Sequence, residues 1–435
     1  MLRSGRPLLA ATLIACLAGP LQGLAAEVDL DDAPLLRKTA AISEGMKELP
    51  AFLRDTDLRL HLRTYYFNQR NSNDTVNEAW AAGGWLAYRS GWLLDTFQMG
   101  ATVYGAAPLY APADRDGTEL LAPGQKGFVV PGIAYGALRY KEYALLTGYR
   151  QLVVQTYVNP HDSRMVPNTF EGVTLGGEVG FVEYLVGYLT RMKTRDADNF
   201  ISMAEAAGVK GNDGGLVMAG INVTPGRGFR LELTNQLGED VFNTAYGGVD
   251  YAHAFTPELG LILSGQYTDQ RAVGGDLLGG SKFTSWATSV GGARVHLRYQ
   301  DLTLIGAFSM TAKGQNIQTP FGVYPGYLHM IVKDFDRAGE VAWLAGLAYD
   351  FSKLLLPGTR AEFSFAQGTN AISPKTRKPE PDEREYDMTI GYVAPKSSAL
   401  RGFSFGAAGG IVDLQHAGKL DYQIRLIINY EIPLL

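Results

Sequence analysis

Hydrophobic and polar residues alternate along most of the chain, as the segment 57–63 illustrates. Three leucines fall on one face of this segment, and three basic residues, Arg59, His61 and Arg63, fall on the other. Strict alternation predicts a β-strand with two unlike faces. The basic face is a ladder of three groups, and the two end groups are about 13 Å apart along an extended strand.

Eighteen segments of this kind follow one another from residue 53 to the end of the chain. They are 56–67, 78–89, 92–104, 130–141, 142–151, 169–178, 181–191, 213–224, 228–237, 241–254, 258–268, 282–298, 301–312, 338–351, 359–368, 384–394, 401–413 and 421–430. Strands of globular proteins average about five or six residues. A tilted strand that crosses a bilayer needs about nine to eleven, so the segment lengths favour strands that cross a membrane.

Long and short connections alternate between these segments. The connections 68–77, 105–129, 152–168 and 192–212 are long, whereas those between them are short turns. Short turns on one side and long loops on the other are typical of an outer-membrane barrel. We therefore predict an all-β protein, a transmembrane antiparallel β-barrel of about 18 strands over residues 53–435. Both ends of such a barrel lie on the short-turn side.

The two faces of each strand predict what the barrel wall contacts. In a barrel of this size the apolar face meets lipid and the polar face lines an aqueous channel. In the segment ARVHLRY, for example, Val295 and Leu297 lie opposite Arg294, His296 and Arg298. Aromatic residues near strand ends are expected to form interfacial girdles, namely Tyr65, Tyr66, Tyr88, Trp92, Tyr104, Tyr140, Tyr349 and Tyr430.

The N-terminus has the features of a secretory signal peptide over residues 1–26. Two arginines precede the apolar stretch PLLAATLIACLAG, and small residues precede Glu27. Cys16 lies inside this stretch, where it is either a small apolar residue or part of a lipoprotein cleavage site. We interpret residues 27–52 as a periplasmic extension with one short helix. These features predict export to the bacterial outer membrane.

Charge and histidine spacing exclude several other functions. Without residues 1–26 the chain has 37 basic and 44 acidic residues, a net charge of −7, which argues against nucleic-acid binding. The six histidines form no His-x-x-x-His pair, and Cys16 is the single cysteine. We therefore expect no metal ion and no cofactor. An enzyme is also not expected, since the adjacent His161, Asp162 and Ser163 of one loop rarely converge as a catalytic triad.

Several segments, in order along the chain, resemble the OprD family of substrate-selective outer-membrane porins. LRTYYFN (62–68) is similar to the first strand of the family, and SRMVPNTFEGVTL (163–175) to its third outer loop and next strand. KDFDRAGE (333–340) followed by YDFSKLLLPG resembles the seventh loop and the next hairpin, and IRLIINYEIPLL resembles the closing strand. The resemblance runs from about residue 50 to 435.

This resemblance implies how the pore selects its solutes. It implies that the third and seventh loops fold into the lumen and form a constriction. It also implies a wall of basic residues that guides small carboxylates or amino acids, with an acidic group on the seventh loop opposite. The expected wall residues are Arg59, His61, Arg63, Arg139, Lys141 and Arg425, and the expected constriction residues are His161, Asp162, Arg164, Lys333, Asp334 and Asp336. Asp334 matches the acidic position.

Alternatives remain at this point. The strands 359–368 and 401–413 carry few basic residues at mid-strand, which also allows a porin for neutral solutes or oligosaccharides. Each arginine, taken singly, is equally compatible with an ion-paired wall residue, and Asp57, Glu232 and Glu362 are available as partners. A barrel enzyme and a non-conducting adhesin are the other classes. The expected partners are outer-membrane lipid and small solutes, with the chain as a monomer or a trimer.

Overall fold

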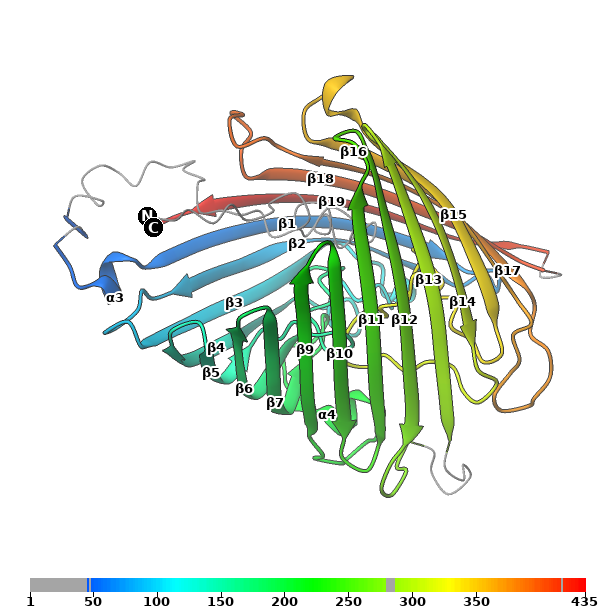
Figure 1. Cartoon of the computed structure of the whole chain (residues 1–435), viewed down its shortest axis with the longest axis horizontal. Coiled ribbons are helices and arrows are strands. Elements are labelled where there is room, and N and C mark those ends of the chain that lie inside the picture. Colours follow the sequence, from blue (N-terminus) through cyan, green and yellow to red (C-terminus); the bar gives the residue numbers. More distant parts are fainter. Residues whose placement is uncertain (1–44, 47, 279–285, 416–417) are drawn as a thin grey trace.

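The computed structural model describes residues 45–46, 48–278, 286–415 and 418–435. Eighteen strands form one closed antiparallel ring, because β1 pairs with β2 on one side and with β19 on the other (Figure 1). The predicted barrel is therefore confirmed. The predicted signal peptide, Cys16 and most of the extension 27–52 lie outside the described residues.

The strands of the ring are β1 (Asp57–Arg70), β2 (Val76–Arg89), β3 (Phe97–Tyr110), β4 (Phe128–Tyr140), β5 (Ala144–Gln151), β6 (Thr169–Val179), β7 (Val182–Lys193), β9 (Leu216–Gly226), β10 (Phe229–Gly238), β11 (Phe242–Ala254), β12 (Leu259–Ala272), β13 (Ala287–Tyr299), β14 (Leu302–Thr311), β15 (Val341–Asp350), β16 (Thr359–Thr369), β17 (Glu383–Val393), β18 (Phe403–Leu414) and β19 (Leu420–Pro433). β1 begins beside the end of β19, where the backbone N–H of Leu434 donates to the carbonyl of Leu58 at 2.7 Å. Both ends of the barrel thus lie on the short-turn side, as predicted.

The remaining elements are short. β8 (Ile201–Ser202) pairs with two residues at the end of β7, outside the ring, and α4 (Met203–Ala206) follows it in the fourth loop. α3 (Ala51–Arg54) precedes β1, and the single turns η2 (Ala113–Arg115) and η4 (Phe351–Lys353) lie in connections. Among the described residues, no helix is long and apolar enough to cross a membrane.

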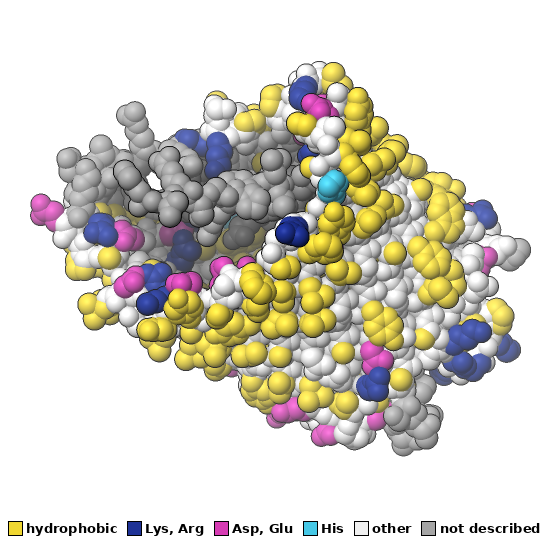
Figure 2. Space-filling model, in the orientation of Figure 1, with side chains coloured by type: hydrophobic (Ala, Val, Ile, Leu, Met, Phe, Trp, Pro, Cys, Tyr) yellow, Lys and Arg dark blue, Asp and Glu magenta, His cyan; other side chains and the backbone are white. Residues whose placement is uncertain are grey.

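The two faces of the wall differ as the alternation predicts. On β10, Leu231 and Leu233 are 39% and 45% exposed, whereas Thr234 and Gln236 are 7% and 2% exposed. Figure 2 shows hydrophobic side chains spread over the outer face of the strands. The apolar face therefore points out to lipid, and the polar face points into the lumen.

An arginine on the lipid face of a central strand is expected to destabilise the barrel. Leu263 of β12 is 46% exposed on the outer face, whereas Ala252 of the neighbouring β11 shares the inner face with Asp250, two positions away. The variant Leu263→Arg should lose about 2–4 kcal/mol of unfolding free energy, and Ala252→Arg should lose much less because its charge enters water. Urea unfolding in lipid vesicles measures both. Equal losses in the two variants would contradict the assignment of faces.

The predicted aromatic girdles are correct for some residues and wrong for others. Tyr140 is 66% exposed at the short-turn end of β4. Tyr65 and Tyr104, however, are 1% and 3% exposed and pack with Phe67 in an apolar cluster inside the barrel. Tyr65 shares the inner face with Arg63, because the two residues are two positions apart on one strand.

Candidate functional site

Loop 3 (152–168) crosses into the lumen and is bound to the middle of β1. Arg63 donates two hydrogen bonds to the carboxylate of Asp162, at 2.6 and 3.0 Å, and one to the carbonyl of Arg164 at 2.6 Å. It also donates to the side-chain oxygen of Asn429 on β19 at 2.7 Å. Arg63 is 6% exposed, so this arginine is an anchor that fixes the loop to the wall.

The other two groups of the β1 ladder are also engaged. Arg59 pairs with Asp57 at 2.8 Å and with Glu431 at 3.6 Å. The ring of His61 stacks on that of Trp85, with 3.8 Å between their centroids. The ladder does face the lumen, but its arginines have carboxylate partners.

Loop 7 (312–340) enters from the opposite part of the ring and touches loop 3. The backbone N–H of Asn159 donates to the carbonyl of Phe321 at 3.2 Å, and the Asn159 side-chain oxygen accepts from the N–H of Val323 at 3.0 Å. The two loops thus meet inside the barrel. This contact forms the constriction that the resemblance implied.

Loop 7 is held on the wall by carboxylates of β17. Asp387 accepts from the N–H of Ile331 at 2.7 Å, and Glu385 accepts from the N–H groups of Val332 and Lys333 at 2.7 and 2.8 Å. Arg425 of β19 donates to the carbonyl of Ile331 at 2.6 Å. Three consecutive N–H groups and one carbonyl of the loop are therefore fixed by charged side chains.

Positive charge gathers around His161 in loop 3. Arg195 of loop 4 (194–215) lies 3.1 Å from the Nε2 atom of His161, and it donates to Ser163 at 2.6 Å. Burial, and then the charges of Arg195, His329, Arg164 and Arg425, lower the pKa of His161 to about 2. The basic side chains among these causes attract anions, whereas burial disfavours an ion of either sign.

The arginines of this cluster outnumber their carboxylate partners. We call Arg63, Arg164, Arg195 and Arg425 the arginine cluster. Arg63 pairs with Asp162, and Arg164 and Arg195 share Glu119, at 3.8 and 2.5 Å. Among the described residues, Arg425 forms no ion pair within 4.0 Å; its guanidinium lies over the ring of Phe67.

Asp334, the acidic residue expected on loop 7, has a basic neighbour. Asp334 pairs with His329 of the same loop, and both side chains are 38% exposed. Burial, and then the charges of Asp334 and Glu340, hold the pKa of Asp336 well above its usual range. Lys333 pairs with Asp421 of β19 at 3.4 Å. Loop 7 therefore presents the partly exposed carboxylate of Asp334 beside the half-buried Asp336, whose pKa is raised.

Two predicted wall residues lie away from the constriction. Arg139 is at the short-turn end of β4, where it pairs with Asp95 and covers the ring of Trp92 at 4.0 Å. Lys141 lies in the turn that follows, near Tyr140 and Tyr143. The structure does not bring either of them together with the arginine cluster.

The sequence did not single out Arg195, Glu119, Glu385 or Asp387. Alternation could have placed Glu385 and Asp387 on the inner face. In the segment EREYDMTI the acidic residues occupy every second position, and the residues between them are exposed on the outer face. No local pattern marks Arg195 and Glu119, which reach the site from loops.

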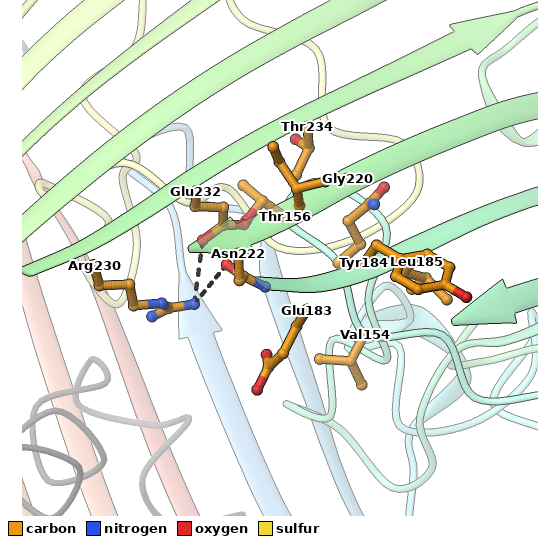
Figure 3. Close-up of a pocket in the computed structure, with 12 residues that line it drawn as sticks. Val154, Thr156, Glu183, Tyr184, Leu185, Gly220, Asn222, Arg230, Glu232 and Thr234 are labelled. Carbon is orange, nitrogen blue, oxygen red and sulfur yellow. Dashed lines mark hydrogen bonds and ion pairs between the residues drawn. The ribbon is translucent and has the colours of Figure 1, made fainter. Parts of the chain in front are cut away.

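A cavity of about 390 Å³ lies beside loop 3 on the strands β7, β9 and β10 (Figure 3). Arg230 donates to Asn222 at 3.2 Å and to Glu232 at 3.4 Å, and Glu183 faces the same space. These residues are near the short-turn ends of their strands, so the cavity belongs to the turn-side half of the lumen. Its lining bears both signs of charge.

The described residues contain no group of three His, Cys, Asp or Glu side chains that could hold a metal ion. The site is therefore a passage through the barrel that loops 3 and 7 cross, with charged side chains along its wall.

Comparisons with known proteins agree with this geometry. A family model described as "outer membrane porin, OprD family" matches residues 50–434. No curated protein matches the chain.

Similar solved structures include OccK9 (OpdG) of Pseudomonas aeruginosa, with a TM-score of 0.78, 21% identity and coverage of 88% of this chain and 100% of that one. OpdK of the same organism, solved with vanillate, has a TM-score of 0.76 and 20% identity over 88% of this chain and 100% of that one. OccAB2 of Acinetobacter baumannii has a TM-score of 0.77 and 20% identity, with coverage of 89% of this chain and 100% of that one. The chain therefore belongs to the OprD family of outer-membrane porins, which are channels of the bacterial outer membrane.

Proposed function

We propose that this porin is a passive channel that prefers small anions, and carboxylates above all. The observation that carries the proposal is the arginine cluster, in which Arg63, Arg164 and Arg195 pair with two carboxylates, Asp162 and Glu119, and Arg425 has no ion pair within 4.0 Å among the described residues. These guanidinium groups lie where loops 3 and 7 narrow the passage, with Glu385 and Asp387 near Arg425 on the same wall. An anion that enters the constriction meets fixed guanidinium groups, which bind carboxylates through two parallel hydrogen bonds.

The chemistry of a similar porin supports this preference. OpdK was solved with vanillate, which is an aromatic carboxylate. In the present chain, the arginine cluster supplies donors for such a group, and Asp334 on loop 7 supplies an acceptor for a hydroxyl or ammonium group on the same solute. Conduction requires several weak sites rather than one tight site, so partial ion pairing of the arginines is compatible with transport.

Neutral solutes are the second candidate. The cavity beside loop 3 carries amide, hydroxyl and carboxylate groups, which together hydrogen-bond well to polyols. A porin for neutral sugars would show fast swelling of proteoliposomes in sugar solutions and little preference between chloride and potassium. The bilayer measurement below separates the two candidates.

Wild-type channels in a KCl gradient are expected to show a reversal potential of anion-selective sign. The variant Arg195→Gln should lower the chloride-to-potassium permeability ratio by about sevenfold, since a unit charge about 7 Å from an ion in water contributes about 0.6 kcal/mol, with opposite signs for chloride and potassium. Arg195→Lys keeps the charge and should keep the ratio. Arg384→Gln, on the exposed outer face of β17, is the matched control.

Two results would contradict the proposal. Cation selectivity of the wild type would show that the acidic groups dominate the passage. An unchanged ratio in a folded Arg195→Gln channel would show that the arginine cluster does not set the preference.

A further inference from the structure

The inner face of β13 repeats the pattern of the β1 ladder. Arg294, His296 and Arg298 have the same order and spacing as Arg59, His61 and Arg63. The residues between them point outward, since Val295 and Leu297 are 38% and 39% exposed. We call Arg294, His296 and Arg298 the β13 ladder.

The two ladders lie at corresponding positions on separate parts of the wall. Arg63 and Arg294 are each near the middle of their strands, whereas Arg59 and Arg298 are each near the short-turn end. Around the ring, β13 is eleven strands from β1 in one direction and seven in the other. The β13 ladder therefore faces the β1 ladder across the turn-side half of the lumen.

Their ionic environments differ. Arg59 and Arg63 both have carboxylate partners. Within the part of the chain that the structure describes, neither Arg294 nor Arg298 has an ion pair within 4.0 Å, and the Nε atom of each is buried without a hydrogen-bond acceptor. Arg298 makes one long hydrogen bond, to the carbonyl of Pro257 at 3.4 Å. A buried donor without a partner is costly, and a bound oxyanion would supply the missing acceptor.

The neighbouring strands contribute no charge directly beside the β13 ladder. Ser264 and Ala307 flank Arg294, and Gly260 and Thr303 flank Arg298. The nearest acid along the wall of β11 and β12 is Asp250, two strands or about 9–10 Å from Arg294, and it accepts a hydrogen bond from Ser264 at 2.6 Å. Asp250 and, from β16, Glu362 act on Arg294 electrostatically, but neither forms an ion pair with it within 4.0 Å.

Loop 7 connects this ladder to the constriction. The ring of Tyr327 covers the guanidinium of Arg294 at 4.4 Å. The amide of Gln266, with its nitrogen toward Pro325, donates to the Pro325 carbonyl at 3.0 Å and accepts from the Tyr327 N–H at 3.2 Å. A solute that leaves the constriction along loop 7 therefore reaches Arg294 first and Arg298 next.

We propose that the β13 ladder is a second anion-binding station, on the turn side of the constriction, that receives the carboxylate group of a solute after it passes loop 7. This inference rests on the proposed preference for anions. Arg294 and Arg298 bind the carboxylate in succession, about 13 Å apart along the strand. The station completes a sequence of weak sites through the pore.

The test compares the double variant Arg294→Gln/Arg298→Gln with the double lysine variant and with Arg384→Gln. Potassium benzoate is added separately to each side of single channels, and the concentration that halves the chloride current is measured. When benzoate is added on the turn side, the concentration that halves the current of the glutamine variant should be about threefold higher for each charge removed. The lysine variant and Arg384→Gln should resemble the wild type. Heat-dependent mobility on gels confirms folding.

The outcomes separate this inference from the preference on which it rests. An anion-selective wild type with unchanged benzoate block in the folded glutamine variant would overturn the station and leave the preference intact. A cation-selective wild type would overturn both. Equal weakening of block from both sides would place the binding at the constriction itself, against the station.

Discussion

Replacing Glu385 and Asp387 with alanine is expected to free loop 7 from the barrel wall and to raise the single-channel conductance. The two carboxylates accept three hydrogen bonds from consecutive N–H groups of the loop, at 2.7, 2.7 and 2.8 Å. Hydrogen bonds to charged acceptors contribute about 1.5 kcal/mol each or more, so three hold the loop with about 4–5 kcal/mol. The released population should therefore rise roughly a thousandfold, and current noise from loop motion should increase.

A carboxylate on the neighbouring strand provides the control for this experiment. Glu362 of β16 also points into the lumen, but its partners are Ser364 and Arg360 rather than loop 7. Planar-bilayer recordings of Glu362→Ala should show nearly wild-type conductance. If the Glu385→Ala/Asp387→Ala channel conducts like the wild type with no added noise, another contact holds the loop.

Most of the barrel could be predicted from the sequence because membrane strands follow one simple physical rule. Each strand has one face in lipid and one in water, so the period of two is visible for ten or more residues. The predicted segment 258–268 corresponds to β12 (Leu259–Ala272), and 421–430 to β19 (Leu420–Pro433). The errors are at the ends, where the predicted 92–104 is found as Phe97–Tyr110. There the loops, rather than lipid, set the pattern.

β8 and α4 were not predicted for a related reason. β8 has two residues, which is too short for any periodicity, and its pairing with β7 depends on the fold of loop 4. Tyr65 was assigned to a girdle by its depth along the strand, although alternation already placed it on the inner face with Arg63. For Tyr65, alternation along the strand therefore predicts the environment of the side chain better than its distance from the strand end does.

Some residues near the meeting point of loops 3 and 7 could be named from the sequence, but their pairings could not. Arg63, His161 and Asp162 lie there, whereas Arg59 and Arg139 lie near the short-turn ends of their strands. Their partners are distant in sequence, as Arg63 and Asp162 show at a separation of 99 residues. Such pairs depend on where a loop crosses the lumen, which no local pattern records. The sequence therefore presented three similar basic groups on β1, whereas the structure gives each a separate role.

The variant Arg63→Leu is expected to destabilise the docking of loop 3 far more than Arg59→Leu. The Arg63 side chain is 5% exposed, and its removal leaves Asp162 without its cation inside the lumen. Breaking a buried pair from one side costs about 3–5 kcal/mol. The Arg59 side chain is 26% exposed and is shared between two acids, and such pairs contribute about 0–1 kcal/mol. Urea unfolding and single-channel conductance measure the difference, with Arg59→Leu as the matched control.

A double-mutant cycle with Asp162→Leu decides between two roles for Arg63. If Arg63 acts mainly as an anchor, Arg63→Leu/Asp162→Leu should recover much of the stability that either single variant loses, because no unpaired charge remains. The double variant removes one charge of each sign, so its anion preference should persist, carried by the other members of the arginine cluster. Equal effects of Arg59→Leu and Arg63→Leu, without coupling to Asp162, would instead indicate that the residues of the β1 ladder all contribute equally to binding passing anions. The ion pairs on β1, and the absence of ion pairs on β13 among the described residues, favour the first outcome, since a guanidinium that holds a loop is less available to a passing solute.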